Sequence, residues 1–552
     1  NMTAVRCGKE IVIFDMGLRL DQVMIHEDAD IENMHSLDLI EMKAIPDDTI
    51  MNGVEGSVKA IVCSHGHLDH IGAIPKLAHR YNAPIISTPY TSELIRQQIA
   101  GEQKFGVNNK LFSLKAGQRY TISPHLTLEF VRAQHSIIDT VFPVLHTPRG
   151  AVVYANDFKL DRTPVLGEPP DFARLRQIGK EGVIALITES VNIADKGRCP
   201  SEKIARDLVR DTITSYEDDK SAIFVSTFSS HISRVKTIAE CAHEIGRKPV
   251  LLGRSMERYS SAAEQLKLVG FPETLSMFGN RRTVDRTLRR IMKTGKDKFL
   301  PIVTGHQGET GAILTRIVMG DTPYRLEKGD KILFSAKVIP NPMNHGQRYL
   351  VEARAKMAGV RIFDELHVSG HAYREDHYDF MQMLQPQQAL AHHARRGFPD
   401  AFLQQPAQAP VALHPLLEVE VRGVARLECA DDREQVGVVV PERRLRAVQH
   451  REQLPLVHQI EIPAQRRRGP HVLGHAEPLV RRRVRAALHA PGHLRAVDAG
   501  HAVLGQHLPP GAVGDDRGLA QQPRDAPREQ VLVRLQAPRR PLIDDDQHDQ
   551  LR

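Results

Sequence analysis

The sequence predicts an α/β protein in which helices cover the faces of β-sheets. Short apolar, β-rich runs alternate with amphipathic stretches of helical period from the start of the chain to about residue 388. This alternation is typical of sheets covered by helices. At 552 residues, the chain is long enough for two or more domains.

The apolar runs and the amphipathic stretches give the expected elements in chain order. Strands are expected at 10–15, 151–155, 183–188, 222–228, 249–252, 299–304 and 331–335. Helices are expected at 201–216 and 231–245. Ser201 is a suitable N-cap, because its hydroxyl can accept a hydrogen bond from the first helical turn. Asn1 leads straight into the first strand, so we expect the natural start of the chain to be missing.

Composition narrows the classes of protein that the chain can belong to. No apolar run approaches the ~20 residues of a membrane helix, and no signal segment is evident, so no membrane partner is expected. The five cysteines form no CxxC pair, which favours reduced thiols and a cytoplasmic protein. The net charge of +7 is only weak support for binding a polyanion.

The chain changes character after Gln388. From Ala389 onward it contains no Lys, Ser, Thr, Asn, Met or Tyr. Apart from Phe398, Phe402, Cys429 and three isoleucines, its residues are those whose codons can begin with G or C. One hypothesis is that residues 389–552 are a shifted-frame or opposite-strand translation of a GC-rich gene. The alternative is a disordered low-complexity extension. Both predict that this anomalous tail has no packed core.

The run Ser64-His65-Gly66-His67-Leu68-Asp69-His70 is the most informative stretch of the chain. It follows the apolar run 58–63 and precedes a helix that we expect to begin near residue 71. Imidazole and carboxylate groups at this spacing suit zinc and similar ions. His65 and His67 can point to one ion, and Asp69 and His70 to a second ion nearby.

Three further residues at strand ends extend this candidate metal site. His135 follows the strand-like run 126–131 and can complete a three-histidine set. Asp157 follows the run 151–155, where a carboxylate can bridge two ions. Asp15 ends the first expected strand, and we expect it to accept hydrogen bonds that orient the loop and its imidazoles.

In this order, Asp15, His65-x-His67-x-Asp69-His70, His135 and Asp157 resemble the metallo-β-lactamase fold. The resemblance implies an αββα sandwich with the metal ions at one edge of its sheets.

A second set of motifs narrows the resemblance. Glu189 ends the run 183–188, and His367-Val368-Ser369-Gly370-His371-Ala372 follows another strand-like segment. The intervening α/β block, with the phrases 228–234 and 304–309, is similar to the β-CASP insertion of nucleic-acid-processing enzymes. The whole is most similar to the RNase J family, in its archaeal form.

The resemblance implies a division into domains. Residues 1–190 would form the first part of the metallo-β-lactamase domain, 191–343 the β-CASP domain and 344–388 the return to the first domain. Residues 389–552 would lie outside both.

The resemblance also implies a function. The activity would be zinc-dependent 5′-to-3′ exoribonuclease action on single-stranded RNA, with two Zn²⁺ per chain, or Mn²⁺ in their place. Glu189, His371 and Asp69 would be catalytic, with the Glu189 carboxylate holding His371 and raising the pKa of its imidazole. The run His367-Val368-Ser369-Gly370-His371 would bind a substrate phosphate, because its glycine lets the backbone approach closely.

The residues around the last expected metal ligand leave room for other interpretations. The family's last metal ligand would fall at about His393, but the residues around it differ from the family pattern. The alternatives are a small-molecule hydrolase of the same fold and a catalytically impaired RNA-binding scaffold. Arg234, Arg254, Arg281 and Arg282 are candidates for RNA backbone contacts or for a solvated surface. A homodimer is one option for the assembly.

Overall fold

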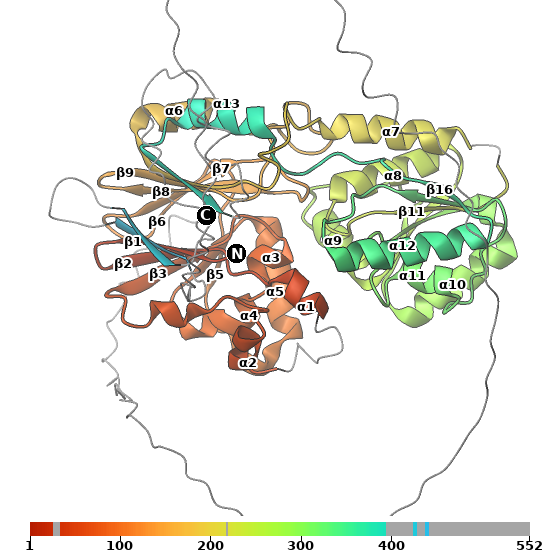
Figure 1. The fold of residues 1–552 in the computed structure, drawn as a ribbon, viewed down its shortest axis with the longest axis horizontal. Helices are drawn as coiled ribbons and strands as arrows, with labels where there is room; N and C mark the ends of the chain where they lie inside the picture. The colour runs from red at the N-terminus through yellow and green to blue at the C-terminus, as the bar shows by residue number, and fades with distance from the viewer. Residues whose placement is uncertain (26–33, 217–218, 393–422, 428–435, 441–552) are drawn as a thin grey trace, which may run out of the picture. The chain divides into compact units, whose positions relative to one another are not determined.

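The computed structural model describes residues 1–25, 34–216, 219–392, 423–427 and 436–440. Three β-sheets organise this part of the chain (Figure 1). Two of them stack in one domain, and the third belongs to the segment inserted after residue 190.

The first sheet has the strand order β18-β19-β1-β2-β3-β4-β5. Its strands are β1 (Thr3–Cys7), β2 (Glu10–Phe14), β3 (Ser57–Val62), β4 (Ile85–Ser87), β5 (Leu111–Ser113), β18 (Gly423–Leu427) and β19 (Val436–Val440). Strands β2 to β5 are parallel, whereas β18, β19, β1 and β2 pair antiparallel.

The second sheet has the strand order β17-β10-β9-β8-β7-β6. Its strands are β6 (Arg119–Thr121), β7 (Thr127–Arg132), β8 (Val141–Thr147), β9 (Gly150–Ala155), β10 (Val183–Glu189) and β17 (Gln388–His392). Strands β9, β10 and β17 run parallel to one another, so the ends of β9 and β10 bring Asp157 and Glu189 to one edge.

The two sheets face each other across a shared apolar core, and helices cover their outer faces. Phe14 of β2 stacks on Tyr154 of β9 in this core, with ring centroids 5.0 Å apart. The helices outside the first sheet are α1 (Leu20–Ile25), α2 (Ser36–Glu41), α3 (Leu68–Ile71), α4 (Ile74–Leu77) and α5 (Pro89–Gly101). Helices α6 (Phe172–Glu181) and α13 (Arg374–Leu384) pack outside the second sheet. The layers are therefore those of an αββα sandwich.

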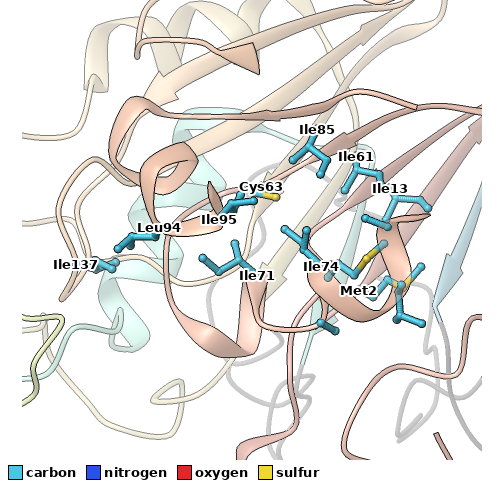
Figure 2. Close-up of a cluster of buried hydrophobic side chains, with 14 of the residues drawn as sticks. Met2, Ile13, Ile61, Cys63, Ile71, Ile74, Ile85, Leu94, Ile95 and Ile137 are labelled. Carbon is cyan, nitrogen blue, oxygen red and sulfur yellow. The ribbon is translucent and has the colours of Figure 1, made fainter. Parts of the chain in front are cut away.

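The core under the first sheet fixes the histidine-rich loop at both ends. Figure 2 shows Cys63, directly before the loop, and Ile71, directly after it, among buried side chains that include Ile95 and Ile137. Cys63 and Ile71 are fully buried. Their burial holds the polar residues between them at the carboxyl end of β3.

The third sheet is parallel throughout, in the order β13-β12-β14-β11-β15-β16. Its strands are β11 (Ile223–Ser226), β12 (Lys248–Leu252), β13 (Ser276–Phe278), β14 (Phe299–Val303), β15 (Lys331–Phe334) and β16 (Arg361–Phe363). Because β16 pairs with β15, this sheet continues past residue 343, where we expected the inserted domain to end.

Helices cover both faces of the third sheet. One face packs against α7 (Glu202–Thr214), α8 (Ile232–Glu244) and α9 (Arg254–Gln265). The other packs against α10 (Arg281–Thr294), α11 (Ile313–Met319) and α12 (Pro342–Met357). The Ser201 side chain caps α7 by accepting a hydrogen bond from the backbone of Lys203. Among the helices described, none has both the length and the hydropathy needed to cross a bilayer.

Three short strands of the anomalous tail pair with the edges of two sheets. Strand β17 extends to His392 and pairs with β10, and the hairpin of β18 and β19 pairs with β1. Without β19 and β17, the strands β1 and β10 would each have an edge of unpaired backbone groups, and the β-branched run of β19 suits such an edge. We expected no packed core after residue 388, and within the described residues the tail adds strands to the edges of two sheets, with Leu390 packed against the core between those sheets.

Arg234 forms a buried ion pair inside the inserted domain. Its guanidinium donates to both carboxylate oxygens of Glu202, at 2.7 and 2.9 Å, and to the carbonyl oxygens of Ser335 and Leu366 at 2.9 and 3.0 Å. The side chain is fully buried. Arg234 is therefore not on an RNA-facing surface, because burial and Glu202 occupy its donors, whereas Arg254, Arg281 and Arg282 are exposed.

Replacing Arg234 with methionine is expected to lower the free energy of unfolding by about 3–5 kcal/mol, because Glu202 is left buried without its partner. Urea unfolding of the full chain, followed by circular dichroism, measures this loss. The double variant Arg234→Met/Glu202→Leu removes both charges and should recover most of the stability. A single variant as stable as the unmodified protein would contradict this interpretation of the pair.

Candidate metal centre

The histidine-rich loop joins β3 to α3 at the carboxyl end of the first sheet. His67 stands at the N-cap of α3, and His70 lies in its last turn. Gly66, between His65 and His67, packs closely against the Leu94 side chain, and a Cβ there would lie 2.5 Å from its terminal methyl group. The loop histidines meet His135, which follows β7, and Asp157, which follows β9.

Four ligand-type side chains meet in a first group: His65, His67, His135 and Asp157. Nδ1 of His67 lies 3.2 Å from Nε2 of His65 and 3.2 Å from Nε2 of His135. An oxygen of Asp157 lies 3.9 Å from Nε2 of His65 and 3.7 Å from Nε2 of His135. The potential ligand atoms of this group all lie within 4.8 Å of one another.

The first group has the protonation that metal binding requires. Burial lowers the pKa of His65 and of His135 well below its usual value, and the neighbouring imidazoles add to this effect. Burial also lowers the pKa of His67, to about 4. A neutral imidazole keeps a free lone pair, which is the form that binds a metal ion.

A second group consists of Asp69, His70 and Asp157. Nε2 of His70 lies 3.2 Å from Asp157 and 3.5 Å from Asp69. The side-chain amide of Asn1 lies 3.0 Å from the same nitrogen. Burial lowers the pKa of His70, but the carboxylates of Asp69, Asp157 and Asp15 outweigh it and hold this pKa well above its usual value.

A third group joins Asp157 to Glu189 and His371. The Glu189 carboxylate lies 2.8 Å from Nδ1 of His371, and its other oxygen accepts a hydrogen bond from the backbone of Phe158. Burial lowers the pKa of His371, but the negative charges of Glu189 and Asp157 have the larger effect and raise this pKa to about 9. Asp157 belongs to all three groups, so it is the centre of the site.

Asp15 orients two parts of the histidine-rich loop at once. One oxygen accepts a hydrogen bond from the backbone of Ser64 at 2.8 Å, and the other lies 2.7 Å from Nδ1 of His70. The Tyr154 hydroxyl donates to the second oxygen at 2.9 Å. Asp15 has a φ of 57°, in the left-handed region that aspartate tolerates better than most residues.

The other histidines also have a partner on the ring nitrogen that faces away from Asp157. Nδ1 of His65 lies 3.0 Å from the Ser64 hydroxyl, and Nδ1 of His135 lies 2.7 Å from the Gly370 carbonyl oxygen. Nε2 of His67 lies 3.1 Å from the hydroxyl of Ser230, a residue of the inserted domain. Sequence reasoning did not assign Ser230 a role.

The run His367–His371 contributes to a small pocket that opens to solvent beside His135. Ser369 and Gly370 line it, whereas the Val368 side chain is buried and His371 faces Asp157. The rest of the lining includes Ser136, Lys159, His231 and Ser233. Gly370 is required here because a Cβ would lie 2.8 Å from the Cβ of Ser136.

The donor set fits divalent metal ions. Six side chains, all imidazoles or carboxylates, are divided between two groups that share one carboxylate. Imidazole and carboxylate ligands around a shared aspartate suit a pair of ions such as zinc. His393, the remaining candidate ligand from the sequence, lies outside the described residues.

Comparisons with known proteins agree with this fold. Residues 51–171 match the family model of the beta-lactamase superfamily domain, and residues 220–349 match that of the ribonuclease J beta-CASP domain. Together, fold and site define a metallo-β-lactamase-fold protein with a β-CASP insertion.

Similarity to individual proteins gives the family within this class. The chain is 54% identical to ribonuclease J of Methanocaldococcus jannaschii over 393 residues, covering 71% of this chain and 88% of the relative. It is 44% identical to ribonuclease J of Pyrococcus abyssi, covering 71% and 86%. Ribonuclease J of Thermus thermophilus is 30% identical, over 71% of this chain and 65% of that protein. The chain belongs to the ribonuclease J family.

Proposed function

We propose that the protein is a metal-dependent ribonuclease that hydrolyses phosphodiester bonds of single-stranded RNA from the 5′ end. The observation that carries the proposal is the position of Asp157, at the centre of three groups of ligand-type and acid–base side chains. Membership of the ribonuclease J family gives the substrate class, and the sequence resemblance gives the direction.

The proposed cofactor is a pair of zinc ions. His65, His67, His135 and Asp157 would hold one ion, and Asp69, His70 and Asp157 the other. Paired divalent ions act as Lewis acids and make water a strong nucleophile at neutral pH. Manganese is compatible with the same nitrogen and oxygen donors.

The protein's own residues provide the rest of the chemistry. Glu189 fixes one nitrogen of His371, which directs the rest of the ring toward the Asp157 group. From there the imidazolium stabilises charge on the phosphoryl oxygens and donates a proton to the leaving 3′ oxygen. The pocket beside Ser369 offers a hydroxyl and a close backbone approach to a substrate phosphate.

Location is proposed on chemical grounds. Cys63, Cys199 and Cys241, which lie within the described residues, are free thiols. Free thiols are typical of a reducing compartment, which supports a cytoplasmic enzyme.

Two labelled RNAs test the proposed activity. The full-length protein with zinc is expected to release labelled mononucleotide at once from a 5′-labelled single strand. A 3′-labelled strand should shorten progressively. Removing metal with a chelator should stop both reactions, and adding zinc or manganese should restore them.

Other outcomes would favour the alternative functions. Hydrolysis of a thioester with no RNA cleavage would support a small-molecule hydrolase. RNA binding with no cleavage at any metal concentration would support a scaffold. Either result would refute the proposed activity.

A further inference from the structure

We propose that Ser230 of the inserted domain positions the metal ligand His67, and that it thereby couples metal binding to the seating of that domain. The Ser230 hydroxyl lies 3.1 Å from Nε2 of His67, across 163 residues of sequence. The inference rests on the metal centre of the proposed function.

The geometry fixes which nitrogen of His67 is available to an ion. Nδ1 lies 3.2 Å from ring nitrogens of both His65 and His135, so it faces the first group. A metal ion takes the lone pair of a neutral ring nitrogen, so the proton must be on Nε2. Nε2–H then donates to the Ser230 hydroxyl. This hydrogen bond sets both the tautomer and the orientation of the ring.

Each of the other three histidines also has a partner on the ring nitrogen that points away from the metal site, as His67 has in Ser230. The outward nitrogens of His65, His70 and His135 face Ser64, Asp15 and the Gly370 carbonyl, respectively. Those partners come from the metallo-β-lactamase domain or from the segment that returns to it. Among the four outer partners, Ser230 alone comes from the inserted domain.

Ser230 is firmly attached to that domain. It lies in the turn between β11 and α8, where its carbonyl oxygen accepts a hydrogen bond from the backbone of Ile232. Before the turn, the Thr227 hydroxyl donates to the Ser335 carbonyl oxygen. After it, buried Arg234 ties the first turn of α8 to Glu202. Ser230 therefore moves with the inserted domain and not with the histidine-rich loop.

The coupling has a thermodynamic consequence. When the inserted domain is in its docked position, Ser230 orients His67, and this raises the affinity of the first group for an ion. By thermodynamic linkage, an ion bound at the first group must favour the docked position of the domain by the same factor. Loss of the Ser230 hydroxyl should weaken both effects. If Ser230 had a purely structural role, the rate of backbone hydrogen exchange in residues 228–235 would not depend on zinc.

Three variants of the full-length protein test the proposal. Ser230→Ala removes the hydroxyl, and Ser230→Thr keeps it. Ser229→Ala makes the same change one residue away, at a side chain with no hydrogen bond to the four histidines among the described residues. Zinc affinity is measured by competition with a chromophoric chelator. Hydrogen–deuterium exchange of residues 228–235 is measured with and without zinc.

Ser230→Ala is expected to bind zinc about 10-fold more weakly, at the low end of the 10–100-fold typical for partners of metal ligands. It should also lose the zinc-induced protection of residues 228–235. Ser230→Thr and Ser229→Ala should behave as the unmodified protein does. Thermal unfolding of the metal-free proteins shows whether Ser230→Ala has damaged the fold.

Equal zinc affinity and equal zinc-induced protection in Ser230→Ala and Ser229→Ala would overturn the proposal. Neither readout involves RNA. If Ser230→Ala weakens zinc binding in a protein that leaves RNA intact, the positioning role stands and the ribonuclease proposal fails. If the unmodified protein binds no zinc, both fail.

Discussion

Replacing Asp157 with asparagine is expected to lower the zinc content from about two ions per chain to one or fewer, and to remove most RNA cleavage. Asp157 is the carboxylate common to both metal groups, so its loss leaves each group one donor short. Mutating a residue that only orients a metal ligand lowers metal affinity or activity by about 10–100-fold. Losing a ligand that both metal groups share should therefore lower RNA cleavage by more than about 100-fold.

Metal analysis and RNA cleavage, measured on the same preparation, check this prediction. The exposed carboxylate of Asp195 provides a matched control, and Asp195→Asn should keep both zinc ions and full activity. Circular dichroism shows whether the near-isosteric Asp157→Asn variant is folded. A folded variant that retains both ions and cleaves RNA normally would remove Asp157 from the centre of the site.

The sequence alone could locate the residues of this centre because most of the signal is local. His65, His67, Asp69 and His70 lie within six positions of one loop, so their proximity follows from covalent geometry. Asp157 and Glu189 could be added because each stands at the end of a strand, and the parallel strands β9 and β10 end at the same edge of their sheet. The structure brings these residues together, while their roles in binding and catalysis stay predictions.

Contacts between residues far apart in the chain could not be predicted from the sequence. Nothing about a serine in a turn indicates that it reaches a histidine 163 residues away, so Ser230 could be found only in the folded chain. Arg234 was misjudged because arginine is rarely buried unless it is paired. A signal did exist, since Arg234 and Ile238 are four residues apart and lie on the same buried face of α8.

The strands after residue 388 were missed for a different reason. The sharp change in composition hid short segments that can still pair with an open sheet edge. Backbone hydrogen bonds require only an extended chain, and Leu390 adds an apolar side chain at the core between the two sheets. The run Val436–Val440 is rich in valine, which favours strands. Composition therefore gave poor guidance at the edges of the sheets.

Replacing His371 with alanine is expected to lower kcat for RNA by about 10²–10⁴-fold, the range for loss of a positioned proton donor, with zinc content unchanged. His371 belongs with Glu189 and Asp157 to the third group, so its geometry allows two roles. As a ligand, it would be needed to retain metal. As a proton donor held by Glu189, it would be needed only for turnover, and metal analysis of the folded variant distinguishes the two roles.

A second substrate sharpens the test of the proton-donor role. The leaving group of bis(p-nitrophenyl) phosphate needs no proton, so the deficit of His371→Ala should shrink with this substrate if the imidazole protonates the leaving 3′ oxygen of RNA. Exposed His345 supplies the control, and His345→Ala should cleave both substrates normally. An equal deficit on both substrates would mean that His371 acts on the phosphoryl group instead. Lost zinc would make His371 a ligand.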